Sequence, residues 1–414
     1  MNRVILHSDL NSFYASVECL YRPELRELPV AVCGDVEARH GIVLARNQIA
    51  KNFGVATAEP LWQAKQKCPR IVFVPPNFER YMRFSRMTRE IYDDYTPYVE
   101  PFGLDECWLD MSGSTHLFGD GKVIADNIRN RIKKELGISV SVGVSFNKIF
   151  AKLGSDLRKP DYTTVISEKN FKEIVWKLPA SELLYVGKST NEKLRHYGIK
   201  TIGEIANIEQ KYLTQILGKM GTMLWLFANG KDFSAVSETK HTHDDNSVKS
   251  IGNSTTTPRD LIDDEDVKIT LYMLSESVAA RLREKQFKAR TVQLHIRNST
   301  MDSYERQAKF DFPVCTAVEF AEKSFELYKK HHPKGIPLRN IGVRATDLIK
   351  DIAQIPLFSE NPKYDRTEKL EFVMDKIKSR FGNYSIQRAL MLLDNDISHH
   401  TPKDDHKIFP VSYF

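Results

Sequence analysis

Three acidic residues interrupt two apolar segments of the sequence, and this setting indicates a site for divalent cations. Asp9 follows a short apolar run in the segment HSDLNSFYASVE, and Asp105 and Glu106 interrupt the apolar segment EPFGLDECWLD. A carboxylate in an apolar setting is costly unless it is paired, protonated or bound to a cation. Hard oxygen ligands of this kind suit Mg²⁺, with Mn²⁺ as the alternative ion. Three carboxylates from two strands could hold two such ions about 4 Å apart, the arrangement used for in-line phosphoryl displacement.

The spacing of the acids restricts the structure around them. Adjacent residues on a regular strand point to opposite faces, so Asp105 and Glu106 can serve one site only at a hairpin tip or bulge. Taken singly, each acid also fits an ordinary strand end or turn. A second chemistry fits the first segment, because an apolar strand ending in D-x-D or D-x-N opens phosphatases that use the first aspartate as nucleophile. The sequence lacks the regular strand–helix alternation that the doubly wound sheet of such enzymes requires.

Length and composition limit the kind of protein that presents these acids. A chain of 414 residues is too long for one ordinary core and predicts two to four domains. No apolar run approaches the roughly 20 residues that span a bilayer, and no signal-peptide pattern opens the chain. The five cysteines are scattered without a CxxC pair, which favours a reducing compartment over a disulfide frame or zinc site. We therefore expect a cytoplasmic protein without membrane contact, and its formal net charge of +6 weakly favours a polyanionic partner.

The elements that must position the acids change in character along the chain. Residues 77–95 show apolar spacing typical of a helix, and SVSVGVS alternates like a strand before the helical segment FNKIFAKLGSDLRKP. Residues 171–232 are predicted to be wholly helical, and the polar stretch 238–250 is predicted to be a linker. A strand, a helix over 267–282 and three further strands then predict a compact α+β module. A last helix is expected over 369–381.

The two acidic segments, in this order and at this spacing, resemble the metal-binding motifs of the Y-family translesion DNA polymerases, in their bacterial DNA polymerase IV branch. The resemblance covers residues 2–349. It implies low-fidelity, template-directed addition of dNTPs to a primer 3′-hydroxyl by two-metal nucleotidyl transfer with Mg²⁺, including the bypass of damaged bases. It also implies an α+β right-hand fold whose expected parts are a palm (1–10 and 77–166), small fingers (11–76), a thumb with a helix-hairpin-helix (167–237), a linker (238–250), a little finger (251–350) and a C-terminal tail (351–414).

The resemblance implies a role for individual residues of this sequence. Asp9, Asp105 and Glu106 would hold the two ions, and the backbone carbonyl of Leu10 would help to hold the ion that carries the triphosphate. Tyr14 matches the steric gate, a ring beneath the incoming sugar that leaves no room for a 2′-hydroxyl. The residues expected to bind the nucleotide are Phe13, Tyr14, Gln48, Lys51 and Lys159, although the helical spacing of Phe13 also fits a core position. The sequence departs from the usual family pattern at Asn11 and at Gln48.

Two segments outside the palm are expected to hold DNA. LLYVGKSTNEKLRHYGIKTIGEIANI has the layout of a helix-hairpin-helix, whose turn offers backbone N–H groups to a phosphate without reading bases. In the last module RLREKQFKARTVQLHIR is basic, and strict alternation would place Arg290 on the apolar face with Val292. A solvated basic surface is the simpler alternative for any one residue. The expected DNA contacts, sequence-independent and salt-dependent, come from Gly187, Lys188, Ser189, Gln293, His295, Arg297, Arg339 and Arg344.

A short segment after the last module points to a protein partner. AQIPLFSE resembles the bacterial sliding-clamp-binding peptide through Gln354, Leu357 and Phe358. An extended segment with an exposed aliphatic–aromatic pair can dock into a hydrophobic pocket, although so short a pattern also arises by chance. We expect a monomer that binds primer–template DNA, dNTPs and a sliding clamp. The rival hypothesis is a non-catalytic DNA-binding clamp partner that retains the scaffold, and the presence of all three acids argues against it.

Overall fold

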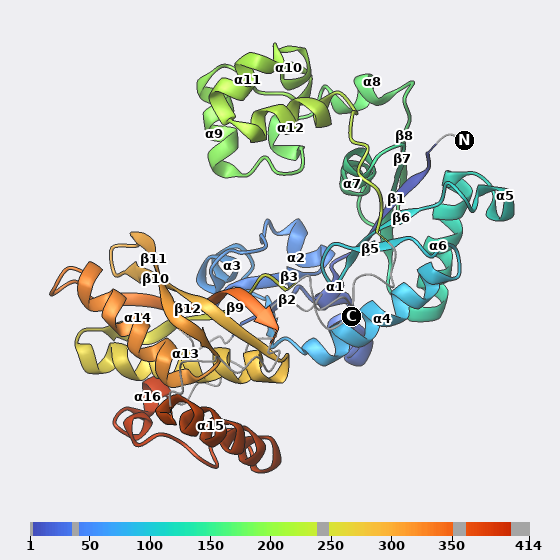
Figure 1. Cartoon of the computed structure of the whole chain (residues 1–414). Helices are drawn as coiled ribbons and strands as arrows, with labels where there is room; N and C mark the ends of the chain where they lie inside the picture. The colour runs from blue at the N-terminus through green and yellow to red at the C-terminus, as the bar shows by residue number, and fades with distance from the viewer. Residues whose placement is uncertain (1–2, 35–40, 238–247, 351–361, 399–414) are drawn as a thin grey trace. The chain divides into compact units, whose positions relative to one another are not determined.

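The computed structural model of the chain describes residues 3–34, 41–237, 248–350 and 362–398. The chain divides into two compact units, of which the first contains the described residues up to 237 and the second those from 248 onward (Figure 1). No helix within these ranges is long and apolar enough to cross a membrane. All five cysteines are buried free thiols.

A five-stranded sheet with the strand order β5-β6-β1-β7-β8 lies at the centre of the first unit. Every residue of β1 is buried, because β1 pairs antiparallel with β6 on one side and with β7 on the other. Only β7 and β8 run parallel, so the sheet is not doubly wound. The strands are β1 (Ile5–Leu10), β5 (Val99–Pro101), β6 (Glu106–Asp110), β7 (Val140–Ser145) and β8 (Thr163–Ile166).

Three longer helices cover the two faces of this sheet. One face packs on α4 (Phe78–Asp93) and α6 (Gly121–Leu136), and the other packs on α7 (Lys148–Leu157) (Figure 1). Local sequence explains where these helices begin, because Asp120 and Asn147 each accept a backbone hydrogen bond as the N-cap of α6 and α7. Helical spacing then buries one side of α6 through Ile124, Ile128, Ile132 and Leu136. The short helix α5 (Thr115–Phe118) precedes α6.

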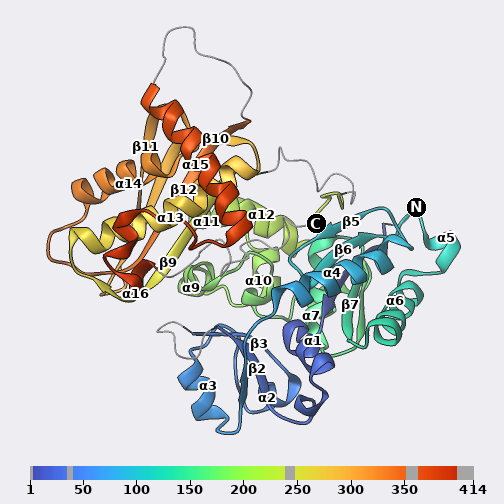
Figure 2. The same ribbon diagram turned by 90° about the horizontal axis from the view of Figure 1, so that it is seen from below.

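A second, smaller sheet with the order β3-β2-β4 follows β1 in the chain and has its own small core. The side chain of Asn47 accepts a hydrogen bond from the Ala50 N–H and starts the one-turn helix α2, which carries Gln48 and Lys51. The elements of this part are β2 (Val30–Cys33), β3 (Val43–Arg46), β4 (Val72–Val74), α1 (Phe13–Tyr21), the 3-10 helix η1 (Pro23–Leu25), α2 (Gln48–Asn52) and α3 (Leu61–Lys67) (Figure 2).

Residues 171–228 form short helices only, which confirms the helical prediction for this stretch. A capping box at Thr201 and Glu204 starts the helix after the hairpin turn. Aromatic contacts from Phe171 to Phe146 and Phe150 join this part to the base of α7. The elements are α8 (Phe171–Val175), η2 (Ala180–Glu182), α9 (Lys188–His196), α10 (Ile202–Asn207), α11 (Gln210–Leu217) and α12 (Lys219–Ala228).

The second unit is an antiparallel four-stranded sheet with the order β11-β10-β12-β9, packed on two helices through one apolar core. The expectation that Arg290 shares the apolar face was wrong. The strand register shifts between Ala289 and Thr291, and this bulge leaves Arg290 exposed while Thr291 is buried. The elements are β9 (Ser250–Leu261), α13 (Asp264–Glu284), β10 (Phe287–Asn298), β11 (Ser303–Val314), α14 (Ala317–His331) and β12 (Leu338–Lys350).

The described part of the C-terminal segment packs on this unit. The helix expected over 369–381 begins earlier, at Pro362, where a proline suits the first turn of a helix. Three apolar side chains of the C-terminal segment, Tyr364, Met391 and Ile397, join the core of the second unit. The elements are α15 (Pro362–Phe381), η5 (Ala389–Leu392) and α16 (Asn395–Ser398), which lie beside α13 (Figure 2).

Candidate active site

Pairing between β1 and β6 brings the three predicted acids together. Asp9 lies directly opposite Glu106 in the strand register. Asp105 precedes β6 and lies in the hairpin between β5 and β6, where its carbonyl accepts a hydrogen bond from the Leu10 N–H at 3.0 Å. Because Asp105 is outside the regular strand, it is not forced to the face opposite Glu106. The hairpin position that the sequence requires for this pair of acids is confirmed.

The three acids place several negative charges in a site that is poorly solvated, and the nearby lysines neutralise these charges only in part. The pKa of Asp105 is raised to about 6, chiefly by burial and then by the nearby charge of Asp9, while two lysines oppose the shift. Burial also raises the pKa of Glu106, with Asp9 adding to the shift and Lys152 opposing it. A raised carboxyl pKa means that the ionised form lacks sufficient positive partners. The site is therefore suited to an added cation.

Two lysines partly neutralise these acids. The Lys159 Nζ lies 2.7 Å from Asp9 Oδ2 and 2.8 Å from Asp156 Oδ1. The Lys152 Nζ donates to both carboxylate oxygens of Glu106 at 2.9 Å. Lys159 was predicted from the sequence, but Lys152 and Asp156 were missed. The spacing of four residues between Lys152 and Asp156 is helical and could have placed these two on one side of α7, just before the turn that carries Lys159.

The donor set fits a divalent cation, although the acids are held by lysines here. Within the described ranges no three His, Cys, Asp or Glu side chains form a ready-made metal site. Asp9 and Glu106 are instead paired with Lys159 and Lys152. Carboxylate oxygens are the ligands that hard divalent ions prefer, and an ion would supply the positive charge that the raised pKa of Asp105 shows to be lacking.

A buried histidine connects β1 to α7 beneath the acids. His7 is fully buried, and its Nδ1 lies 2.8 Å from the Ser155 Oγ. Ser155 gives its own hydrogen to the Lys152 carbonyl, so His7 donates to Ser155 and its Nε2 carries the lone pair. Burial and the charges of Lys152 and Lys159 lower the pKa of His7, which keeps the ring neutral. This chain of hydrogen bonds fixes the part of α7 that carries Lys152.

Asn11, whose role the sequence left open, joins three segments around the acids. Its side-chain amide donates to the Ser141 Oγ, and its Oδ1 accepts from the Ser139 hydroxyl and from the Asp161 N–H at 2.8 Å. Asp161 lies two residues after Lys159. The carboxamide therefore holds the turn that carries Lys159 against the end of β1. A carboxylate at this position could accept hydrogen bonds but could not donate one to Ser141.

Tyr14 lies at the start of α1 in a group of aromatic rings. Its ring stacks on Tyr81 of α4, with a centroid distance of 4.2 Å and an interplanar angle of 9°, and Phe78 contacts it edge-on. Burial, with a smaller contribution from Asp105, raises the pKa of Tyr14 to about 12, so the hydroxyl stays neutral. Phe13, in contrast, is only 3% exposed and belongs to the core. Its side chain matches the core alternative considered for it.

The other expected nucleotide ligands lie on the small α2 helix. Gln48 and Lys51 are both exposed, and the Gln48 amide donates to the Asn52 side chain at 3.0 Å. Within the described part of the chain, neither residue forms a hydrogen bond or ion pair with the three acids. Leu10 is 2% exposed, so only its backbone can serve a ligand.

The expected DNA contacts fall into two groups. In the helical part, Gly187 is the N-cap of α9 without a side-chain cap, and Lys188 and Ser189 are exposed beside it. In the sheet of the second unit, Gln293 lies opposite Arg344, and Arg297 lies opposite Asn340.

The expected DNA-binding residues of the second unit also have neighbours that affect their charge and geometry. Glu305 on β11 accepts from the Gln293 amide and lies 3.6 Å from His295, so one acid accompanies these polar side chains. Arg339 lies at the register shift of β12. The clamp-binding residues Gln354, Leu357 and Phe358 lie outside the described residues.

Comparison with known proteins gives matches over both units. The impB/mucB/samB family model matches residues 8–156, the model of its C-terminal domain matches 248–357, and a thumb-domain model described for DNA polymerase-iota matches 182–232. DNA polymerase IV of Acetivibrio thermocellus is 52% identical over 400 residues, which cover 96% of this chain and 100% of that protein. DNA polymerase IV 1 of Bacillus subtilis is 36% identical over 394 residues, 94% of each chain.

A solved structure matches the fold. A chimera of the Y-family DNA polymerases Dbh and Dpo4 superposes with a TM-score of 0.72 at 24% identity, over 84% of this chain and 99% of its own. Palm, small fingers, helical thumb and little finger are together the architecture of a Y-family DNA polymerase. The chain belongs to the DNA polymerase IV branch of the impB/mucB/samB family, which occurs in bacteria. It is a DNA-directed DNA polymerase that uses a DNA template and dNTPs, and its family is metal-dependent. The predicted family and fold class are confirmed.

Proposed function

We propose that this polymerase performs low-fidelity translesion synthesis by two-metal nucleotidyl transfer with Mg²⁺. The observation that carries the proposal is the meeting of Asp9, Asp105 and Glu106 at the β1–β6 pairing, with the pKa of both Asp105 and Glu106 raised by burial and mutual charge. Two bound ions would activate the primer 3′-hydroxyl and neutralise the charge that develops on the triphosphate. The three acids would hold them, together with the Leu10 carbonyl.

The remaining site residues would bind and orient the nucleotide. Lys159 is held beside Asp9 by Asp156 and by the turn that Asn11 fixes, and its amine would pass from the carboxylate to a phosphate oxygen. Lys51 and Gln48 on α2 would add a charge and an amide donor. The ring of Tyr14, stacked on Tyr81, would support the sugar and exclude a 2′-hydroxyl. The backbone of Phe13 precedes it at the start of α1.

The small size of the fingers supports the low-fidelity part of the proposal. This part contains a three-stranded sheet, a five-residue α2 and a seven-residue α3. Fingers of this size would enclose a nascent base pair only loosely. An unpaired or damaged template base would then be tolerated. The domain boundaries that we propose remain 1–10 and 77–166 for the palm, 11–76 for the fingers, 167–237 for the thumb, 238–250 for the linker, 251–350 for the little finger and 351–414 for the tail.

Primer extension across a defined lesion tests this proposal directly. We expect the full chain to extend a primer past a single abasic site when Mg²⁺ is present, and to stop at the primer end in EDTA. Mn²⁺ is expected to replace Mg²⁺ with further loss of base selectivity. An undamaged template of the same sequence is the control. Extension on that control with a complete stop one nucleotide before the abasic site would exclude lesion bypass while leaving polymerase activity intact.

The alternatives have less support. A non-catalytic clamp partner has no need to retain one buried and two half-buried carboxylates side by side, which are costly when no reaction uses them. A phosphatase with Asp9 as nucleophile requires a parallel doubly wound sheet, whereas β1 pairs antiparallel on both sides. We further propose a monomer that reaches a sliding clamp through residues 354–358 and acts on DNA in the cytoplasm.

The thumb hairpin is expected to hold a DNA phosphate. The first N–H groups of α9 have no side-chain cap, and a Cβ built on Gly187 would meet nothing within 4 Å, so a phosphate can approach this helix end. Changing Lys188 to Glu is expected to raise the Kd for primer–template DNA about tenfold and to lower the salt slope by about one. Filter binding at several salt concentrations measures both quantities.

The control carries the same charge change elsewhere in the thumb. Lys211→Glu lies on α11, away from the hairpin turn, and we expect its Kd to stay within about twofold of the unchanged protein. An equal loss of DNA affinity in both variants would mean that net charge, rather than the hairpin, determines the affinity. A loss confined to particular DNA sequences would contradict a contact to phosphate. Arg297 and Arg344 on the open sheet of the little finger are expected to contribute in the same sequence-independent way.

A further inference from the structure

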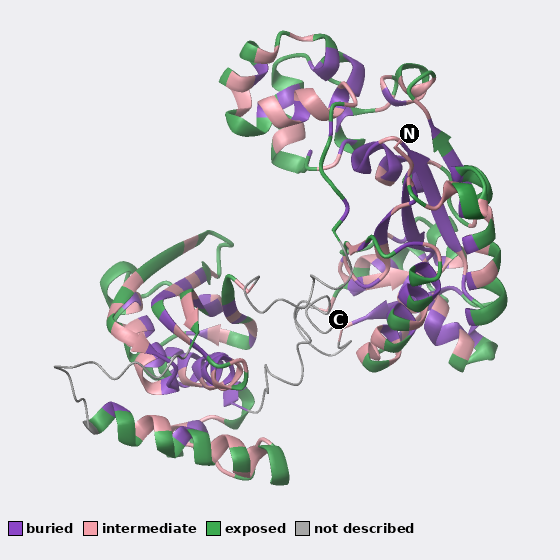
Figure 3. Cartoon of the chain, turned by 45° about the vertical axis from the view of Figure 1, so that its right-hand side comes forward, coloured by how far each residue is buried: buried purple, intermediate pink, exposed green. Residues whose placement is uncertain are grey.

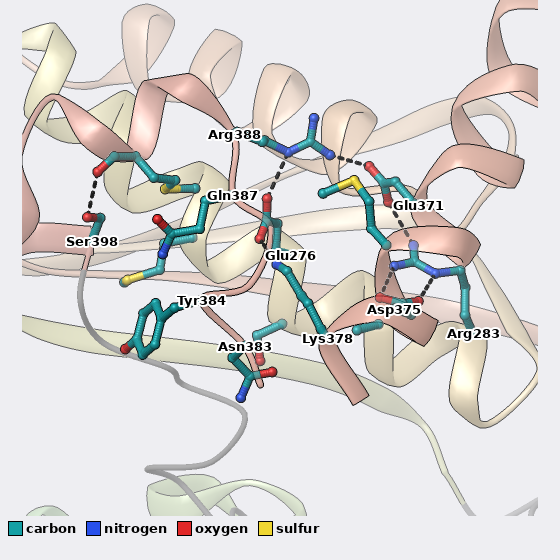
Figure 4. A pocket seen from close by; sticks show the side chains of 15 residues that line it. Glu276, Arg283, Glu371, Asp375, Lys378, Asn383, Tyr384, Gln387, Arg388 and Ser398 are labelled. Atoms are coloured by element: carbon teal, nitrogen blue, oxygen red, sulfur yellow. Dashed lines mark hydrogen bonds and ion pairs between the residues drawn. The ribbon is translucent and has the colours of Figure 1, made fainter. Parts of the chain in front are cut away.

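The C-terminal helix α15 is held in one orientation on the second unit. Glu371 is 2% exposed and forms ion pairs with Arg283 at 2.7 Å and with Arg388 at 2.6 Å. Arg283 also pairs with Asp375, and Arg388 also pairs with Glu276 of α13 (Figure 4). Removing one member of such a buried network leaves an unpaired charge, which costs several kcal/mol. This network determines which side of α15 faces α13 and which side faces outward.

An apolar row runs along a side of α15 that no described element covers. Helix α15 carries exposed residues along its length (Figure 3). Leu370, Val373 and Phe381 are 56%, 50% and 66% exposed, and Ile377 between them is partly exposed. Their spacing of 3, 4 and 4 residues places them on one helix face, in a row about 16 Å long at 1.5 Å per residue. Soluble proteins rarely leave contiguous apolar rows without a use. The spacing is that of a seam that packs on another helix.

Cations accompany this row. Lys369, Lys376 and Arg380 lie along one edge of it at the helical period of 100° per residue, and Arg366 lies one turn before Leu370. None of the four has a carboxylate partner among the described residues, although the carboxylates of Glu371 and Asp375 are nearby in sequence. Those two acids are directed into the network with Arg283 on the other side of the helix. The outward face of α15 therefore combines apolar contact area with unneutralised positive charge.

We propose that this face docks an acidic amphipathic helix of another protein. Apolar side chains of that helix would pack on the row from Leu370 to Phe381, and its carboxylates would pair with Lys369, Lys376 and Arg380. DNA would satisfy the cations but leave the apolar row in water. A second copy of α15 would bring further cations to the contact, because its own acids are used in the network. The site lies outside residues 248–357 that the C-terminal family model matches, so it is separate from the DNA-holding sheet.

Two designed peptides test the proposal on the full chain. Both are labelled helical peptides with the same leucine seam, one flanked by glutamates and the other by lysines, and fluorescence anisotropy measures their Kd. We expect the glutamate peptide to bind and the lysine peptide to bind at least tenfold more weakly. The double variant Leu370→Ala, Phe381→Ala is expected to weaken the glutamate peptide at least tenfold. Leu392→Ala is the matched control, because Leu392 is 65% exposed on the same unit but lies on η5, off the row, and the Kd of the glutamate peptide is expected to change less than twofold.

A charge reversal gives the most specific result. Lys376→Glu together with Arg380→Glu is expected to reverse the preference, so that the lysine peptide binds more tightly than the glutamate peptide. Circular dichroism and primer extension, both expected to be unchanged, show that each variant is folded and active.

Several outcomes would overturn the proposal. Equal binding of both peptides, or binding of neither, would exclude an acidic helix as the occupant. Binding only after the chain is ended at Ser398 would show that residues 399–414 of the chain itself occupy the face. A dimer that dissociates on Phe381→Ala would identify a second copy instead. Binding of phosphatidylglycerol vesicles through the same residues, without binding of the glutamate peptide, would identify an anionic membrane.

Discussion

Replacing Asp105 by alanine is expected to abolish primer extension while the affinity for primer–template DNA changes less than about twofold. The carboxylate lies in the β5–β6 hairpin, next to the Asp9–Glu106 pair, where its removal takes away one of the three proposed cation ligands. Loss of one such ligand costs several kcal/mol of transition-state stabilisation, which corresponds to a decrease of about 10³-fold or more in rate. Since we propose that the thumb and little finger hold the DNA, its binding is not expected to depend on this side chain. Single-turnover extension in Mg²⁺ and filter binding measure the two effects.

Asp110→Ala is the matched control for this variant. Asp110 ends the same strand, β6, and its carboxylate accepts a local hydrogen bond from the Ser112 N–H. Loss of this carboxylate is expected to change the rate of primer extension by no more than a few-fold. The thermal stability of the Asp105→Ala variant provides a second check.

Because burial raises the folded-state pKa of Asp105 to about 6 from 3.8, this group stabilises the fold at low pH and loses that contribution as the pH rises from about 4 to 6. At neutral pH in EDTA the Asp105→Ala variant is therefore expected to melt no lower than the unchanged protein. Full extension by the folded variant would disprove the catalytic assignment.

Replacing Tyr14 by alanine is expected to raise ribonucleotide incorporation relative to deoxynucleotide incorporation by about 100-fold, or roughly 3 kcal/mol. The ring cannot move aside to admit a 2′-hydroxyl, because Tyr81 stacks on it at 4.2 Å and Phe78 contacts it edge-on. Alanine would remove the ring and leave room for the extra oxygen. The ratio of kcat/KM for matched ribo- and deoxynucleotides measures the effect.

Two control variants separate the ring from its hydroxyl and from the core. Tyr14→Phe keeps the ring, so sugar selectivity is expected to change less than about threefold. Phe13→Leu changes a core side chain that is 3% exposed, so we expect lower stability without altered sugar selection. Unchanged selectivity in Tyr14→Ala would remove Tyr14 from the role of steric gate.

Much of the candidate site could be predicted because its signals are local. Acids in apolar segments are unusual wherever they occur, so Asp9, Asp105 and Glu106 were identified without a structure, and the need for a hairpin followed from strand geometry alone. The alternation of β10 was predicted wrongly at Arg290, because a bulge depends on pairing with β11 that local sequence does not specify. The early start of α15 and the packing of the C-terminal segment were also missed. A polar stretch of sequence does not indicate which of its charged residues form ion pairs with distant partners.

The sequence by itself determined the identity of the acids and much of the order of helices and strands, since these depend on residue types and short-range periodicity. The class of protein was predicted from the resemblance of the two acidic segments to the motifs of a known family. Only the tertiary structure decided which charges meet. Lys152 pairs with Glu106 across 46 positions, His7 reaches Ser155 across 148, and Glu371 joins Arg283 across 88. Such contacts have no local pattern, because they arise when packing places separate elements side by side. The electrostatics of the site and the outward face of α15 follow from those contacts.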